Sequence, residues 1–131
     1  MDNPNRNLGA QKLKAGSVKN ENGKTLIEHL EICESFRERN QGLLGRDGLP
    51  RGHGMLISPC SSIHTFAMRF HIDCFFLDKE DRVLAIKPDL PPGRMAFGPL
   101  KTRSTLEIAA GWLKDDDAPH PGDRLDISVT G

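Results

Sequence analysis

The sequence predicts a mostly β fold, namely a compact β-sandwich or barrel with one short capped helix. Short segments alternate apolar and polar residues, as strands with one face in water do. Turn-forming residues separate these segments at regular intervals, which is typical of all-β domains. A helix is indicated at Ser35, which is followed three residues later by Glu38 in the pattern of a capping box.

Length and charge limit the classes of protein to which the chain could belong. Its 131 residues suffice for one hydrophobic core but not for two. We expect a disordered polar tail over residues 1–10 and a single β domain over residues 11–131. Lysine and arginine together number 18, as do aspartate and glutamate, so the formal net charge is zero. We therefore expect a soluble monomer with no nucleic-acid partner and no membrane association.

The predicted strands follow the apolar pattern along the chain. A weak strand over residues 13–18 is joined by turn residues to a stronger strand over residues 25–33. The helix that begins at Ser35 is expected to end at Gly45 or Gly48. Beyond it, the alternation predicts strands over residues 55–58, 63–68, 72–77, 83–87, 105–110 and 124–130. The proline-rich connection over residues 88–104 is expected to lack regular structure.

Two features predict how these strands are buried. Residues 72–77 are apolar on both faces apart from Asp73, so this strand should be covered on both sides. Glu107 alternates with Leu106 and Ile108, and we therefore expect it on the solvent face of its strand. The predicted core consists of Leu30, Ile32, Leu56, Ile72, Phe76, Leu84, Ile86, Leu106, Ile108 and Ile127.

Ionisable side chains interrupt the strongly apolar segment over residues 60–78. His64, Arg69, His71 and Asp73 lie within it, and burying such groups is unfavourable unless they are paired. The segment is therefore either the edge of a binding site or a core that requires polar pairing. Asp73 could pair with an arginine, cap a neighbouring loop or act as a catalytic acid. We expect it to face Arg69 across a turn at residues 70–71. The candidate arginines are Arg46, Arg69, Arg94 and Arg103.

The chain has three cysteines, Cys33, Cys60 and Cys74, at spacings that match no standard disulfide framework. This pattern favours reduced thiols and a cytoplasmic location. Two of the cysteines could join His64 and His71 in a zinc site, but structural zinc sites use short knuckle turns rather than strands. We therefore expect no metal, no cofactor and no disulfide, and we expect Cys74 to be buried and inert.

Cys60 could also act as a nucleophile with His64 as its base. The residues around Cys60 form a predicted loop, where a thiol can be exposed and activated. Residues four positions apart along an extended strand are separated by about 13 Å. The two side chains would therefore meet only if the loop turned back on itself.

Several motifs occur together in the order and spacing of a known family. They are RNQGLLGRDGLPRGHGML, SIHTFAMRFHIDCFFLD, RVLAIKPDLPPGR, TLEIAAG and PGDRLDI. The chain thereby resembles the prokaryotic family called domain of unknown function 192. This resemblance implies a compact, mostly β sandwich or barrel with a short helix, and it implies no reaction. The chain departs from the commoner family pattern at Ala67 and residues 69–71, where that pattern has Trp and Lys-Asn-Thr.

Three functions remain open on the sequence alone. The first is a small non-enzymatic ligand-binding or accessory domain, which binds a small molecule or a protein in a cleft between the His64 strand and the proline-rich loop. The second is a small hydrolase that uses Asp73 with His64, or Cys60 with a histidine, although no complete catalytic set is visible. The third is an assembly partner that contributes a sheet edge to another protein. The residues predicted to line a ligand pocket are His53, His64, Arg69, Asp73 and Arg94.

Overall fold

A seven-stranded sheet dominates the computed structural model, which describes residues 13–114 and 116–130. The strand order is β6-β5-β8-β3-β2-β1-β9, and β4 pairs with β7 in a separate two-stranded ribbon. The helix α2 covers Phe36–Gln41. The strands are β1 (Lys14–Lys19), β2 (Thr25–Cys33), β3 (His53–Ile57), β4 (Ser62–His64), β5 (Ile72–Leu77), β6 (Val83–Leu90), β7 (Met95–Phe97), β8 (Ser104–Ala109) and β9 (Asp126–Val129). The predicted mostly β fold with one capped helix is thereby confirmed.

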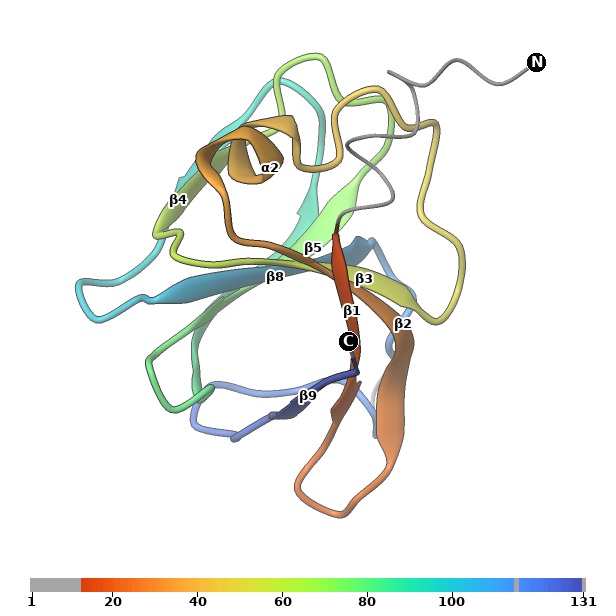
Figure 1. Cartoon of the computed structure of the whole chain (residues 1–131), viewed down its shortest axis with the longest axis vertical. Helices are drawn as coiled ribbons and strands as arrows, with labels where there is room; N and C mark the ends of the chain where they lie inside the picture. The colour runs from red at the N-terminus through yellow and green to blue at the C-terminus, as the bar shows by residue number, and fades with distance from the viewer. Residues whose placement is uncertain (1–12, 115, 131) are drawn as a thin grey trace.

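The large sheet is mixed and curled (Figure 1). β2 and β3 run parallel because the chain crosses over between them through α2, whereas the other neighbours are antiparallel. The segment before β9 meets the beginning of β6, where the Val83 N–H donates to the Asp123 carbonyl (2.8 Å). Arg82 and Arg124 form an isolated bridge at the same place. The two edges of the sheet therefore approach each other at one end without closing a barrel.

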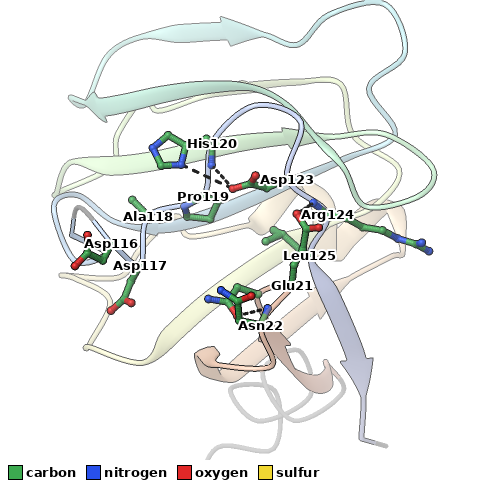
Figure 2. Close-up of a pocket in the computed structure, with 11 residues that line it drawn as sticks. Glu21, Asn22, Asp116, Asp117, Ala118, Pro119, His120, Asp123, Arg124 and Leu125 are labelled. Atoms are coloured by element: carbon green, nitrogen blue, oxygen red, sulfur yellow. Dashed lines mark hydrogen bonds and ion pairs between the residues drawn. The ribbon is translucent and has the colours of Figure 1, made fainter.

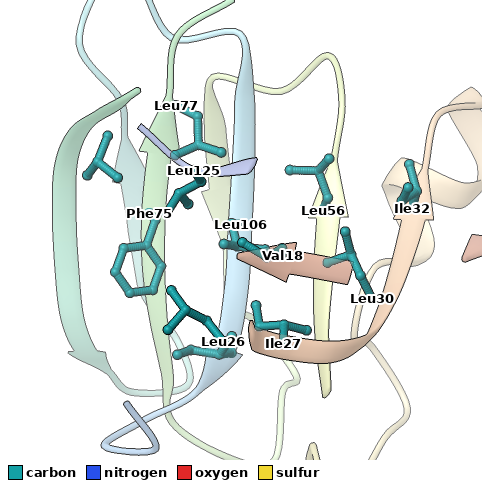
Figure 3. Packing of buried hydrophobic residues seen from close by; sticks show 12 residues of the cluster. Val18, Leu26, Ile27, Leu30, Ile32, Leu56, Phe75, Leu77, Leu106 and Leu125 are labelled. Atoms are coloured by element: carbon teal, nitrogen blue, oxygen red, sulfur yellow. The ribbon is translucent and has the colours of Figure 1, made fainter. Parts of the chain in front are cut away.

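Apolar residues cover both faces of the central strands. The first hydrophobic cluster lies inside the curl and takes alternate residues of β5 and β8, such as Phe75 and Leu106 (Figure 3). The second cluster lies on the opposite face and includes Met55, Cys74 and Phe76. α2 and β4 lie on one side of β3 and β8, and β9 lies on the other (Figure 1). Because both faces are covered, every residue of β5 is buried, as predicted.

Most of the predicted core is buried. The nearly inaccessible members are Leu30, Ile32, Leu56, Ile72, Phe76, Leu106 and Ile108. Leu84, Ile86 and Ile127 are only half-buried, because β6 and β9 are the edge strands of the sheet. The prediction for Glu107 is wrong. Its side chain is 4% exposed, since the second cluster covers the face of β8 that was expected to meet solvent.

The helix α2 begins where the capping box predicts and ends earlier than expected. The Oγ of Ser35 accepts the N–H of Glu38 (3.1 Å), and the Oε1 of Glu38 accepts the N–H of Ser35 (3.1 Å). The helix stops before Gly45 and Gly48 because Gly42 leaves the helical conformation with a φ of 46°. None of the residues of α2 is buried, so its short-range capping bonds are important for its stability.

The region between β4 and β8 differs most from the prediction. β4 ends at His64 rather than at residue 68, because the Thr65 hydroxyl donates to the Pro91 carbonyl (2.6 Å) and Ala67 has a φ of 63°. The proline-rich connection contains the strand β7, which pairs with β4. This pairing fills the place between the His64 strand and the proline-rich loop where we expected a ligand cleft. The predicted tail over residues 1–10 lies outside the described residues.

Candidate ligand-binding cleft

A cleft lies on the side of β4 opposite β7, beside the end of α2. Its inner part has a volume of about 140 Å³, and a more open outer part of about 420 Å³ adjoins it. We call the two parts together the α2–β4 cleft. Its apolar wall includes Leu43, Leu44, Ile57, Ile63 and Met68. Its polar groups include Arg39, Asn40, Cys60, His64 and Glu107 in the inner part, and Arg103 in the outer part.

Glu107 is the unusual group of the inner cleft. It lies in β8, opposite Met55 of β3 and Cys74 of β5, within an apolar environment. Among the described residues, no side chain or backbone group forms a hydrogen bond or an ion pair with its carboxyl group. Burial raises the pKa of this group to about 7. Buried carboxyl groups in proteins normally have a partner, so Glu107 is available to a ligand.

Cys60 and His64 line the same cleft without forming an activated nucleophile. The Cys60 thiol donates to the Ser62 carbonyl (3.1 Å), and burial raises its pKa. A protonated thiol is a weak nucleophile. The His64 ring stacks on Phe66 with 5.0 Å between the centroids, and its Nδ1 accepts the Phe66 N–H (3.3 Å). The imidazole is therefore oriented by Phe66 at the end of β4.

Asp73 binds the backbone near the end of β6 and in the turn after β8, and it does not pair with Arg69. Its Oδ1 accepts the N–H of Asp89 (2.8 Å), and its Oδ2 accepts the N–H of Gly111 (3.0 Å). Arg69 pairs instead with the exposed Asp47 (2.6 Å). The expected Asp73–Arg69 pair is therefore replaced by separate partners. Of the roles considered for Asp73, the loop cap is the one that its contacts match.

The other two predicted lining residues also lie away from the α2–β4 cleft. His53 begins β3 and packs against His29 of β2, with ring centroids 4.7 Å apart. The cleft adjoins the opposite end of β3, at Ile57. Arg94 precedes β7, where its backbone N–H donates to the Thr65 hydroxyl (2.9 Å). Of the five predicted residues, His64 lines the cleft.

A second hollow of about 300 Å³ lies beside the turn between β1 and β2 (Figure 2). Its lining is mostly polar and acidic. Two of its carboxylates already have protein partners: Asp117 pairs with Lys24 (2.7 Å), and Asp123 accepts the N–H of His120 (2.8 Å). This hollow therefore resembles a solvated surface network more than a site prepared for a ligand.

The described residues also bear on metals, disulfides and membranes. Within residues 13–114 and 116–130, no group of three or more His, Cys, Asp or Glu side chains could hold a metal ion. The three cysteines are free, and the predicted burial of Cys74 is confirmed. Burial raises the pKa of Cys33 to about 12. None of the helices in the described part of the chain has the length and apolar character needed to cross a membrane.

Comparison with protein families gives the identity of the domain. Residues 17–127 match domain of unknown function 192, a family described as "Uncharacterized ACR". The chain belongs to this family. The match includes the sequence motifs on which the resemblance is based, which extend from Arg39 in α2 to Ile127 in β9. No curated protein matches the chain.

Two solved structures share the fold of this family member. A protein of unknown function from Novosphingobium aromaticivorans is 22% identical, with a TM-score of 0.73, over 87% of this chain and 84% of that chain. A Sinorhizobium meliloti protein, described as a proposed transcription regulator, is 21% identical, with a TM-score of 0.75, over 88% of this chain and 93% of that chain. At these identities the likeness extends to the fold alone.

Proposed function

We propose that the chain is a small non-enzymatic domain that binds a small molecule in the α2–β4 cleft. The observation that carries this proposal is Glu107, whose buried carboxyl group lines the inner cleft without a partner among the described residues. Ligand pockets generally combine an apolar wall with a few polar groups. The cleft has this composition, with Leu43, Ile57 and Met68 in the wall and His64 at its edge.

The energetic state of Glu107 supports a ligand rather than a purely structural role. Burial raises the pKa of Glu107 to about 7, so the ionised form of this carboxyl group is unfavourable in the folded protein. Buried ionisable groups of this kind persist in proteins mainly where they serve a function. Asp73 provides a contrast within the same molecule, because two backbone N–H groups occupy both of its carboxylate oxygens. A ligand that donates hydrogen bonds to Glu107 would stabilise the ionised form of its carboxyl group.

Hydrolysis has less support than binding. Cys60 is held as a thiol that donates to a backbone carbonyl, and the two carboxylate oxygens of Asp73 accept the N–H groups of Asp89 and Gly111. Neither group is therefore prepared to attack or to transfer a proton. His64 has no orienting carboxylate among the described residues, which leaves the cleft without a nucleophile–base–orienter set.

We further propose a cytoplasmic, monomeric protein without a nucleic-acid partner. The free thiols of Cys33, Cys60 and Cys74 support a reducing compartment. The formal net charge of zero supports the absence of a nucleic-acid partner, since such partners attract basic surfaces.

A fragment screen tests the proposed function. Melting temperatures of the wild-type protein are measured with a library of small polar fragments, because a ligand of the folded state raises the melting temperature by mass action. The screen is repeated with Asn40→Trp, which places an indole at the mouth of the cleft. Asn40 is exposed and lines both parts of the cleft. We expect at least one fragment to stabilise the wild type and to lose its effect in this variant.

Arg37→Trp is the matched control for this screen. Arg37 is exposed on the same helix and lies outside the lining of the cleft. The control variant should therefore keep the wild-type response to each fragment. A library without any hit, or hits that persist equally in Asn40→Trp, would refute a binding role for the cleft.

A further inference from the structure

We infer that the ligand of the α2–β4 cleft is a small zwitterion, with an ammonium group bound by Glu107 and a carboxylate bound at the mouth by Arg39 and Arg103. This inference rests on the proposed function and names the chemical class of its ligand. It follows from the distribution of hydrogen-bond acceptors and positive charges along the cleft. Glu107 lines the inner part, Arg103 lines the outer part, and Arg39 lines both.

The inner end matches an ammonium group. Glu107 supplies a carboxyl group without a partner among the described residues. The carbonyls of Arg39 and Asn40, in the last turn of α2, receive no backbone N–H from residues 13–114 or 116–130. The Cys60 thiol already donates to a carbonyl. An ammonium group has three donors and no acceptor, and its charge would compensate the ionised form of Glu107.

The outer end matches an anion. The Arg39 guanidinium donates to the carbonyls of Glu34 (3.2 Å) and Pro59 (3.2 Å) rather than to an acidic side chain. Arg103 is exposed in the outer cleft, and no described carboxylate lies within ion-pair distance of it. The planar fork of a guanidinium binds a carboxylate in a bidentate manner. A carboxylate at the mouth would therefore find two cations that have no acidic partner within residues 13–114 and 116–130.

The shape of the cleft sets the direction of the ligand. The inner part of about 140 Å³ holds a small group, whereas the outer part of about 420 Å³ is larger and more open. The reverse orientation would bring the ligand carboxylate against Glu107, where two carboxyl groups repel each other unless one is protonated. A ligand whose ammonium group points inward and whose carboxylate points outward would meet an opposite charge at each end of the cleft.

A matched set of probes tests this assignment by NMR titration. Butylamine carries only the cation, butyrate only the anion, and γ-aminobutyrate both, while glycine and ε-aminocaproate vary the separation of the charges. We expect the best amino acid to bind most tightly, butylamine more weakly and butyrate not at all. Glu107→Gln should weaken binding of butylamine and of the best amino acid by about tenfold or more, since a hydrogen bond to a charged group is lost.

Arg103→Ala tests the contact with the ligand carboxylate independently of the contact with the ammonium group. It should weaken binding of the best amino acid several-fold and leave butylamine unchanged, because butylamine has no group that reaches the mouth. Arg51→Ala, at an exposed position outside the cleft, is the control and should change neither probe. Equal binding of butyrate and butylamine, or an amine affinity that survives Glu107→Gln, would overturn the inference.

A pH titration provides an independent readout. The titratable groups around the inner cleft are Cys60, Cys74, His64 and Glu107, with the permanently charged Arg39 on α2. The amine affinity should rise between about pH 6 and about pH 8 as Glu107 loses its proton. This rise should vanish in Glu107→Gln and persist in His64→Gln. An affinity that falls over this range would instead indicate a neutral amide bound to the protonated acid, and would overturn the inference.

The two proposals fail in distinguishable ways. If library fragments bind in the cleft and are blocked by Asn40→Trp, but no amine-containing probe binds, the ligand class is wrong and the binding function stands. If neither the library nor the probes produce binding that Asn40→Trp blocks, the binding function itself is wrong.

Discussion

The alternation of side chains along β8 directs the Glu107 side chain toward the second hydrophobic cluster. Its neighbours across the sheet are Met55 and Cys74, which neither donate a hydrogen bond to the carboxyl group nor place a positive charge beside it. Such surroundings favour the neutral form of a carboxyl group. The pKa of about 7 is therefore a consequence of burial alone, and it links the stability of the whole protein to pH.

The first prediction concerns this linkage. Between about pH 4.5 and about pH 7 the folded state keeps a proton on Glu107 that the unfolded chain has lost, so raising the pH over this range lowers the free energy of unfolding. Glu107→Gln carries no titrating proton. Its stability relative to the wild type should therefore increase by about 2–3 kcal/mol between about pH 5 and about pH 8, measured by urea unfolding at each pH.

Thr105→Val is the control for this measurement. Thr105 is buried on the same face of β8 and has no proton to lose in this range; its hydroxyl donates to the Cys60 carbonyl (3.1 Å). Its stability deficit should be the same at both pH values. A constant difference between Glu107→Gln and the wild type would show that Glu107 does not titrate between them.

The second prediction concerns Asp73. Asp73→Asn leaves one acceptor oxygen where two backbone N–H groups need one each, and places an amide N–H₂ against either Asp89 or Gly111. We expect a loss of about 1–3 kcal/mol in the free energy of unfolding. Any fragment bound in the α2–β4 cleft should keep its effect on the melting temperature, because Asp73 lies outside the lining.

Asp47→Asn is the control for the second prediction. Its carboxylate forms an exposed pair with Arg69, and exposed pairs contribute about 0–1 kcal/mol. Thermal unfolding of both variants distinguishes the roles. If Asp73→Asn were as stable as Asp47→Asn and also abolished fragment binding, Asp73 would belong to the ligand site and not to the loop cap.

At the level of elements, α2 depends on local bonds to an unusual degree. Its six residues are too few to be stable as an isolated helix, and none of them is buried. The capping box satisfies N–H groups at its beginning, and Glu38 also accepts the N–H of Glu34 (2.9 Å). Since the last turn of α2 lines the cleft, these capping bonds also help to position one wall of the proposed site.

The third prediction tests this dependence. Ser35→Ala removes the oxygen that accepts the Glu38 N–H and should lower the free energy of unfolding by about 0.5–2 kcal/mol. Hydrogen exchange at residues 36–42 should accelerate more than exchange in β5, because the change acts locally. Ser128→Ala, on the exposed part of β9, is the control and should change neither quantity. Uniform acceleration across the sheet would contradict a local effect.

At the scale of the whole molecule, the pairing of β1 with β9 forms one edge of the seven-stranded sheet. Gly16 of β1 lies against the backbone of β9, and a Cβ atom at this position would overlap the Ser128 carbonyl oxygen. The same region brings the chain before β9 to the beginning of β6. The absence of a side chain at Gly16 therefore allows the backbones of β1 and β9 to approach closely at this edge of the curled sheet (Figure 1).

The fourth prediction follows from this contact. Gly16→Ala should lower the free energy of unfolding by about 1–3 kcal/mol, since the backbone of β9 must shift to make room. Exchange of the Thr130 N–H, which donates to the Ala15 carbonyl (2.8 Å), should accelerate. Gly48→Ala is the matched control, because nothing lies within 4 Å of the added Cβ there. Equal stability of the two variants would contradict a steric role for Gly16.

The local patterns of the sequence were sufficient for several elements. The strands at residues 25–33 and 72–77 match their predicted bounds, and the capping box correctly identifies Ser35 as the beginning of α2. These features depend on period-two alternation and on hydrogen bonds between residues a few positions apart. Such information is contained in a short stretch of chain, which is why it can be inferred without the fold.

The candidate site depended on the tertiary structure. A glutamate between Leu106 and Ile108 has the same pattern whether the second face of β8 meets water or a second cluster, so no sequence signal could indicate that Glu107 is buried. The residues that cover this face include Leu43, which follows α2, and Ile63 of β4, and both lie far from β8 in the sequence. Period and capping determined the elements by themselves, whereas the burial of Glu107 and the position of the cleft were decided by packing between distant segments, because burial depends on what covers a face.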